Sequence, residues 1–177
     1  MYVDYHDKEW GVPIHDDRLI FEFLVLESFQ AGLSWAIVLR KRENFREAFA
    51  GFDPVKVAKF TAKDVKRLLG DAGIIRNRAK IAAAVNNAHR FLEVQKEFGS
   101  FAKYAWGFVG GKPIKNKWKT IKHLPAKTLI AEAWAADLKK RGFKFLGPTV
   151  IYAHMQAAGM VNDHTVDCFR YREVSRL

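Results

Sequence analysis

Residues 138–159 read LKKRGFKFLGPTVIYAHMQAAG, and the architecture of the chain is organised around them. Three cations end an apolar segment, a glycine- and phenylalanine-rich stretch follows, and Pro148 stands at the first position of a new helix. We expect two helices joined by the turn GFKFLG. Gly142 and Gly147 bracket this turn because the backbone there needs positive φ or a close approach. The sequence therefore predicts a helix–hairpin–helix unit at about 130–159.

The same turn is predicted to bind a phosphate. Phe143, Phe145 and Leu146 can pack into the core, which leaves the N–H groups at the start of the second helix pointing outward. Basic side chains surround that point, and such a unit holds a DNA backbone without reading its sequence. The alternative is a tight turn with a solvated basic face. The candidate DNA-binding residues are Lys140, Gly142, Phe143, Lys144, Phe145, Gly147 and Thr149.

Charge outside the turn favours a polyanionic partner. The chain has 30 Lys and Arg residues against 19 Asp and Glu, a net charge of +11. A second basic group, Arg76, Arg78 and Lys80, and an exposed basic connector at 110–125 support a DNA surface. The alternative is a helical domain whose basic surface serves only solubility.

Start and stop signals of helices recur along the chain, and no alternating strand pattern is evident. Predicted helix starts lie at Asp16, Ser34, Asp53-Pro54, Thr61 and Ser100. We expect one all-α domain covering residues 1–177. A single cysteine excludes an intramolecular disulfide, and no leader or membrane-spanning run is present. We therefore expect an intracellular, cytoplasmic protein with no membrane partner.

The only cysteine lies in GMVNDHTVDCFRY, residues 159–171. His164 and Cys168 are four residues apart, the spacing that puts two side chains on one face of a helix. They could be half of a metal site, or a buried cysteine beside a hydrogen-bonded histidine. The residues alone leave both open.

Six segments together resemble the 3-methyladenine DNA glycosylase I family. They are YHDKEWGVP (5–13), LESFQAGLSW (26–35), FDPVKVA (52–58), DAGIIRNRAKI (71–81), KKRGFKFLGPT (139–149) and MQAAGMVNDH (155–164). The resemblance covers nearly the whole chain in the right order and is weakest over 110–137.

The resemblance implies an all-α helix–hairpin–helix DNA glycosylase fold, with two closely packed helical lobes and a pocket between them. It also implies a monomeric enzyme of base-excision repair. Such an enzyme flips 3-methyladenine out of double-stranded DNA and hydrolyses its N-glycosidic bond, leaving an abasic site.

The family's pocket suits a cationic base, because alkylation at N3 gives adenine a positive charge. Glu27 matches the pocket carboxylate, Trp35 its stacking partner, and Tyr2 and Tyr5 two further aromatic residues. Aromatic faces attract a cationic ring, and a carboxylate offsets its charge. Our hypothesis is that Glu27 stabilises the cation and orients the water. Taken alone, Glu27 would be a solvated glutamate and Trp35 a core residue.

Related helix–hairpin–helix glycosylases carry a catalytic aspartate in a Val-Asp-x-His segment. The equivalent run here is Val161-Asn162-Asp163-His164, with asparagine in its place. We therefore expect no strong general base, which fits a substrate already primed to leave.

The resemblance also implies a structural Zn²⁺ that joins the two ends of the chain. His6, His164 and Cys168 match three ligands, and the family's fourth ligand, an upstream cysteine, has no counterpart in this sequence. Either the start is shortened or the site is weakened. Acidic residues close in sequence are Asp4, Asp7, Asp163 and Asp167.

Two alternatives to the repair enzyme remain on the same scaffold. One is a non-catalytic binder of damaged or structured DNA, against which Glu27 and Trp35 argue because a phosphate-binding module needs no pocket carboxylate. The other is a glycosylase of broader specificity that also releases 7-methylguanine.

Overall fold

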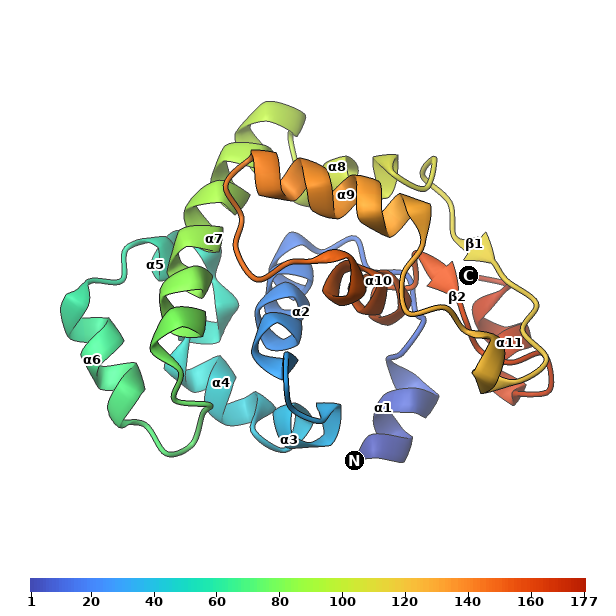
Figure 1. The fold of residues 1–177 in the computed structure, drawn as a ribbon, viewed down its shortest axis with the longest axis horizontal. Coiled ribbons are helices and arrows are strands. Elements are labelled where there is room, and N and C mark those ends of the chain that lie inside the picture. Colours follow the sequence, from blue (N-terminus) through green and yellow to red (C-terminus); the bar gives the residue numbers. More distant parts are fainter.

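Helix α2 (Asp17–Gln30) runs through the middle of the protein and contacts α3, α7, α8 and α10 (Figure 1). The computed structural model describes residues 1–177. The carboxylate of Asp16 caps α2 by accepting from the backbone N–H of Leu19 at 2.8 Å. Every residue from Ile20 to Phe29 is buried, so the helix is covered on all sides.

One lobe follows α2 in the sequence and lies on one side of it (Figure 1). Helices begin at the predicted starts Asp53-Pro54 and Thr61: Asp53 caps the helix that begins at Pro54, and Thr61 forms a capping box with Asp64. The single helix expected after Ser34 is instead interrupted at Lys41. The elements are α3 (Trp35–Arg40), α4 (Arg42–Ala48), η1 (Ala50–Phe52), α5 (Pro54–Ala58), α6 (Ala62–Gly70) and α7 (Arg78–Phe98).

The second lobe combines the N-terminal helix with the C-terminal half of the chain. Its elements are α1 (Tyr2–Lys8), α8 (Phe101–Gly107), β1 (Ile114–Lys115), η2 (Ile121–His123), α9 (Leu129–Lys140), α10 (Pro148–Ala157), β2 (Val161–Asn162) and α11 (Phe169–Val174). Helix α10 packs against both α9 and α2. The helical fold in two packed lobes is confirmed. The parallel pairing of β1 with β2 was not predicted, because two-residue strands are too short to show alternation.

The segment that follows α1 packs against the end of α10. Gly159 has φ +67°, and a Cβ there would lie 2.4 Å from the carbonyl carbon of Val12. The backbone N–H of Ile14 donates to the carbonyl of Ala158 at 3.1 Å. Only glycine permits so close an approach at position 159. No helix of the protein is both long and apolar enough to cross a lipid bilayer.

The turn between α9 and α10 differs from its prediction at two positions. Gly142 has positive φ as expected, but Gly147 does not, with φ −74°. Phe143 and Leu146 are buried, whereas Phe145 is 44% exposed and adopts φ +59°. The expectation that Phe145 packs into the core is wrong. Adjacent side chains in the turn point in different directions. Because Leu146 faces the core, the side chain of Phe145 points to solvent, and its backbone adopts the left-handed conformation.

Candidate functional site

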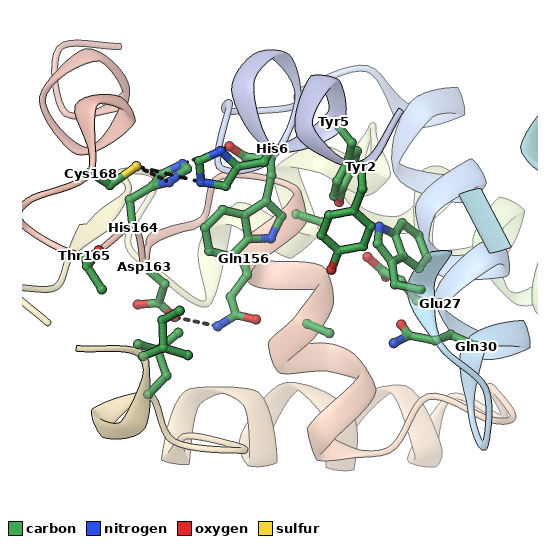
Figure 2. A pocket seen from close by; sticks show the side chains of 16 residues that line it. Tyr2, Tyr5, His6, Glu27, Gln30, Gln156, Asp163, His164, Thr165 and Cys168 are labelled. Atoms are coloured by element: carbon green, nitrogen blue, oxygen red, sulfur yellow. Dashed lines mark hydrogen bonds between the residues drawn. The ribbon is translucent and has the colours of Figure 1, made fainter. Parts of the chain in front are cut away.

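A cavity of about 420 Å³ lies between the two lobes, bounded by α1, α2, α3 and α10 (Figure 2). The polar and aromatic side chains that line it include Tyr2, Tyr5, Trp10, Glu27, Gln30, Trp35, Gln156 and Asp163. All four residues that the sequence assigned to a base pocket are in this set. Ile121 and Leu124 from the connector add an apolar edge.

Glu27 has one carboxylate oxygen bound and one free. It is 3% exposed, and its Oε2 lies 2.8 Å from Nδ1 of His154. Its Oε1 is buried and has no hydrogen-bond partner. Burial raises the pKa of Glu27, while the contact with His154 acts in the opposite direction. The free oxygen is a strong acceptor held out of water, so a donor or a cation entering the cavity gains much from meeting it.

Two aromatic rings pack in a tilted arrangement in the same cavity as this carboxylate. The ring centroids of Tyr5 and Trp35 are 5.6 Å apart with planes inclined at 56°. The indole Nε1 of Trp35 is buried and has no acceptor. Burial, and secondarily the charge of Glu27, raises the pKa of Tyr5, so its phenol stays protonated. Tyr2 is 53% exposed, and Figure 2 shows its ring beside the side chain of the buried Glu27.

Asp163 is the other carboxylate that lines the cavity, and its acceptor sites are filled. Its four donors are Asn116 Nδ2 and Trp118 Nε1 at 2.7 Å to Oδ1, and Tyr152 Oη at 2.6 Å and Gln156 Nε2 at 2.8 Å to Oδ2. These bonds join the connector to α10. Asp163 therefore organises the wall of the cavity, a role that spacing in the sequence did not reveal.

Asn162, which the family resemblance aligns with a catalytic aspartate of other glycosylases, has its side chain engaged elsewhere. The amide Nδ2 donates to the carbonyl of Tyr171 at 3.0 Å and to Oγ of Ser175 at 2.9 Å. With Asp163 also occupied, Glu27 is the carboxylate left to act on a bound base.

A second cluster adjoins the cavity, where His6, His164 and Cys168 place their ligand atoms within 4.8 Å of one another. The Sγ of Cys168 is 3.7 Å from Nε2 of His6 and 3.6 Å from Nδ1 of His164 (Figure 2). The expectation of one shared helical face is wrong, because α11 begins only at Phe169. A turn closed by the bond from Cys168 N to the carbonyl of Thr165 brings the pair together instead.

The outer nitrogens of both histidines are already paired. Nδ1 of His6 is 2.7 Å from Oδ1 of Asp7, and Nε2 of His164 is 3.1 Å from the carbonyl oxygen of Trp10. Burial lowers the pKa of His164, which favours its neutral form. The remaining acidic candidates lie outside the cluster: Asp4 pairs with the N-terminus and Lys8, Asp163 is saturated, and Asp167 is exposed.

The hairpin between α9 and α10 presents unpaired donors to solvent. The backbone N–H groups of Gly147 and Thr149 have no acceptor within the chain. Lys139, Lys140 and Lys144 are exposed beside them.

Two further cations, one in the hairpin and one in the second basic group, are already paired within the protein. Arg141 pairs with Glu97 and Asp137. Lys80, expected in an exposed basic group, is buried, and its Nζ donates to the carbonyls of Phe29 and Ala31 at 2.9 and 2.6 Å. The physical reason is that the C-terminal carbonyls of α2 need donors.

Comparisons with known proteins agree with one another. Residues 1–171 match the family described as methyladenine glycosylase. DNA-3-methyladenine glycosylase 1 of Escherichia coli K12 is 48% identical over 171 residues, covering 97% of this chain and 91% of the relative. The DNA-3-methyladenine glycosylase of Haemophilus influenzae is 49% identical over 168 residues, covering 95% and 91%.

Solved structures are similarly close. A crystal structure of 3-methyladenine DNA glycosylase I superposes with a TM-score of 0.93 at 49% identity, covering 95% of this chain and 92% of the other. A Staphylococcus aureus structure described as showing the basis of 3-methyladenine recognition gives a TM-score of 0.93 at 40% identity, covering 95% and 89%.

Proposed function

This chain belongs to the methyladenine glycosylase family, and we propose that the cavity between α1, α2, α3 and α10 receives the alkylated base. The protein is a DNA repair enzyme that hydrolyses the N-glycosidic bond of 3-methyladenine in alkylated DNA. The base is flipped out of the duplex, released, and leaves an abasic site.

The main support for assigning the cavity to the alkylated base is that Oε1 of Glu27 is buried and has no hydrogen-bond partner. Alkylation at N3 makes adenine cationic, and a buried carboxylate oxygen without a donor offsets that charge and accepts from the exocyclic amine. The rings of Tyr5 and Trp35 supply π-faces, each worth about 1–2 kcal/mol for a cation. Tyr2 closes over the base from the solvent side.

Bond breaking needs little proton transfer in this mechanism. A cationic purine leaves as a neutral molecule, so the enzyme stabilises the charge, orients the sugar and admits a water. The positive charge moves from the base to the sugar as the glycosidic bond breaks, a water then adds to C1′ of the sugar, and its extra proton leaves to solvent. The saturation of Asp163 by four donors is consistent with the absence of a separate strong base.

The hairpin is the proposed contact with the DNA backbone. The N–H groups of Gly147 and Thr149 lie at the start of α10, where the helix dipole favours a phosphate oxygen. Lys140 and Lys144 add charge, and Gly142 permits the sharp turn. Phe143 anchors the turn in the core, whereas the exposed Phe145 lies free to touch the duplex. We propose that the enzyme acts on double-stranded DNA inside the cell as a monomer.

Zn²⁺ is the proposed occupant of the cluster of His6, His164 and Cys168. For bond lengths of about 2.3 Å to sulfur and 2.0–2.1 Å to nitrogen, tetrahedral geometry puts ligand S and N atoms about 3.6 Å apart. The measured separations are 3.7 and 3.6 Å.

The surroundings of these ligands support the same assignment. Asp7 and the Trp10 carbonyl hold the outer ring nitrogens, which leaves the inner nitrogens as lone-pair donors. The ion would tie α1 to the C-terminal segment and supply no step of the reaction.

Release of free bases from methylated duplex DNA tests the proposed function. We expect the protein to liberate 3-methyladenine, with Glu27→Gln and Trp35→Ala each losing about tenfold or more, as expected for a lost contact to a cation. Leu129→Ala, at an 83% exposed site on α9, is the control and should match the wild type. Release of 7-methylguanine would indicate a broader specificity. Tight duplex binding without any released base would show a non-catalytic binder.

A further inference from the structure

His154 contacts the carboxylate of Glu27 and has no assigned role in the reaction. It comes from α10, and its side chain is fully buried. Its Nδ1 is 2.8 Å from Oε2 of Glu27, on the side of the carboxylate opposite the free Oε1. A histidine is a costly choice for a fully buried position, where a hydrocarbon side chain would fill the same space.

The second ring nitrogen of His154 identifies the protonation state. Nε2 is buried without a partner, and the ring packs edge-on against Trp134 at 5.6 Å between centroids. An imidazolium would place a charged N–H at this position with no acceptor, which costs more than a neutral unpaired group. The single proton of a neutral imidazole therefore sits on Nδ1, where the carboxylate accepts it.

No other charged group contacts Glu27 from the surrounding helices. From α1, Tyr5 stays protonated because burial raises its pKa. From α3, Trp35 carries no charge, and on α10 the hydroxyl of Tyr152 donates to Asp163 instead. Burial drives the carboxyl of Glu27 toward its neutral form, and His154 is the group that opposes this.

We propose that His154 is a positioning residue of the glycosylase reaction: as a neutral donor it keeps Glu27 ionised and holds Oε1 toward the alkylated base. The inference rests on the proposed role of Glu27. A protonated Glu27 would lose its attraction for the cation, and its free oxygen would meet the exocyclic amine without a charge. His154 therefore sets the lowest pH at which the enzyme captures a cationic base.

The experiment uses 3,9-dimethyladeninium, a permanent cation that resembles the alkylated nucleoside and has no glycosidic bond to break. Its binding to the full chain is measured by calorimetry from about pH 5 to about pH 8.5, above the ordinary pKa of a glutamate, because burial raises the pKa of Glu27. Because the charge of the probe does not titrate, any loss of affinity at low pH comes from the protein. We expect about a tenfold loss per pH unit below the apparent pKa of Glu27, with proton release on binding in that range.

We call the pH range in which affinity for the probe falls with falling pH the acidic limb. Loss of the donor at His154 should move this limb to higher pH. His154→Phe removes the donor and fills the space, so we expect the limb to shift to higher pH by about one unit or more. His154→Gln restores an N–H donor and should bring the limb back toward the wild-type position. Ile151→Val, a buried change on the same helix at a residue that does not line the cavity, is the matched control and should leave the limb unmoved. An unshifted limb in His154→Phe, or a shift to lower pH, would overturn the inference.

The variant Glu27→Gln distinguishes an error in the role of His154 from an error in the proposed role of Glu27. We expect this variant to bind the probe weakly and with no acidic limb. If it binds like the wild type, the assignment of Glu27 itself is wrong. If it loses binding while His154→Phe keeps the wild-type limb, only the role of His154 is wrong. Should His154→Phe fail to fold, His154→Leu replaces it, because leucine also lacks a donor. A limb shifted to higher pH in His154→Leu, with none in the control, supports donation by His154, and an unshifted limb contradicts it.

Discussion

The side-chain amide of Asn87 makes two hydrogen bonds to the backbone of Lys144. Its Nδ2 donates to the carbonyl of Lys144 and its Oδ1 accepts from the N–H, both at 2.8 Å. Asn87 is buried in the long helix α7, whereas Lys144 is at the middle of the hairpin. A neighbouring amide, Asn86, donates to the carbonyl of Gly142 at 2.9 Å. Helix α7 thereby fixes the conformation of the turn that we assign to phosphate binding.

Asn87→Ala should lower both the free energy of unfolding and the affinity for DNA. Two backbone groups lose their partners, so we expect a loss of about 1–3 kcal/mol in the free energy of unfolding, measured by urea denaturation. Affinity for an undamaged duplex should fall as well, because the turn loses its fixed shape. Asn86→Ala removes one bond to the backbone of the turn, at Gly142, and a longer one of 3.2 Å to Oδ1 of Asn87, but leaves both Asn87–Lys144 bonds in place. This variant, at a more exposed position, is the control and should have the smaller effect on each measurement. Equal effects would contradict the special role of Asn87.

Exposed lysines at the hairpin should set the salt dependence of DNA binding. Each phosphate contact contributes about 0.9 to the slope of log affinity against log salt concentration. We expect Lys140→Ala and Lys144→Ala each to reduce the slope by about one, equally for damaged and undamaged duplexes. Lys63→Ala removes the same charge from α6, at the edge of the molecule in Figure 1, and should leave the slope unchanged. An unchanged slope in both hairpin variants would remove the turn from the interface.

Local signals in the sequence predicted much of this fold, and they failed where a partner distant in sequence determines the outcome. The caps at Asp53 and Thr61 depend on residues two or three positions away and were predicted correctly. Lys80 looked like a surface cation, but its partners are carbonyls of α2, some 50 residues earlier. The hydrogen bond from Asn87 to Lys144 joins residues 57 positions apart, so no local pattern in the sequence predicts it.

The same distinction applies within the cavity. Motif resemblance identified Tyr2, Tyr5, Glu27 and Trp35, and the structure brings all four to one cavity. It did not identify His154, whose contact with Glu27 joins residues 127 positions apart. A histidine on an apolar helix is usually interpreted as core, and only the fold shows what its ring touches.

Glu27→Gln should stabilise the protein at neutral pH even though it impairs the reaction. Burial raises the pKa of Glu27 above its value in the unfolded chain, so the folded state binds this proton more tightly. The resulting stabilisation is present below the unfolded pKa of about 4.5 and is lost as pH rises through the folded pKa. At pH 7.5 the buried charge therefore costs stability that glutamine, a neutral residue of the same shape, does not.

Urea denaturation at two pH values measures this difference. We expect Glu27→Gln to exceed the wild type by about 1–3 kcal/mol at pH 7.5, and the gain to shrink as pH approaches 4. If the variant is less stable than the wild type at both pH values, the bond to His154 contributes more to folding than burial of the charge costs.

Cys168→Ser should abolish the proposed zinc site and loosen the joint between the chain ends. We expect the wild-type chain to carry about one Zn²⁺ when purified without chelator, and the variant to carry none, measured by elemental analysis. Chelation should lower the melting temperature of the wild type alone.

Cys168 is the only thiol in the sequence, so its rate of reaction with a disulfide reagent gives an independent readout. We expect the reaction to be slow with zinc bound and fast after chelation. Excision of 3-methyladenine should persist in the variant at temperatures where it stays folded, because no step passes through the metal. A wild-type thiol that reacts equally fast before and after chelation would rule out metal ligation by Cys168.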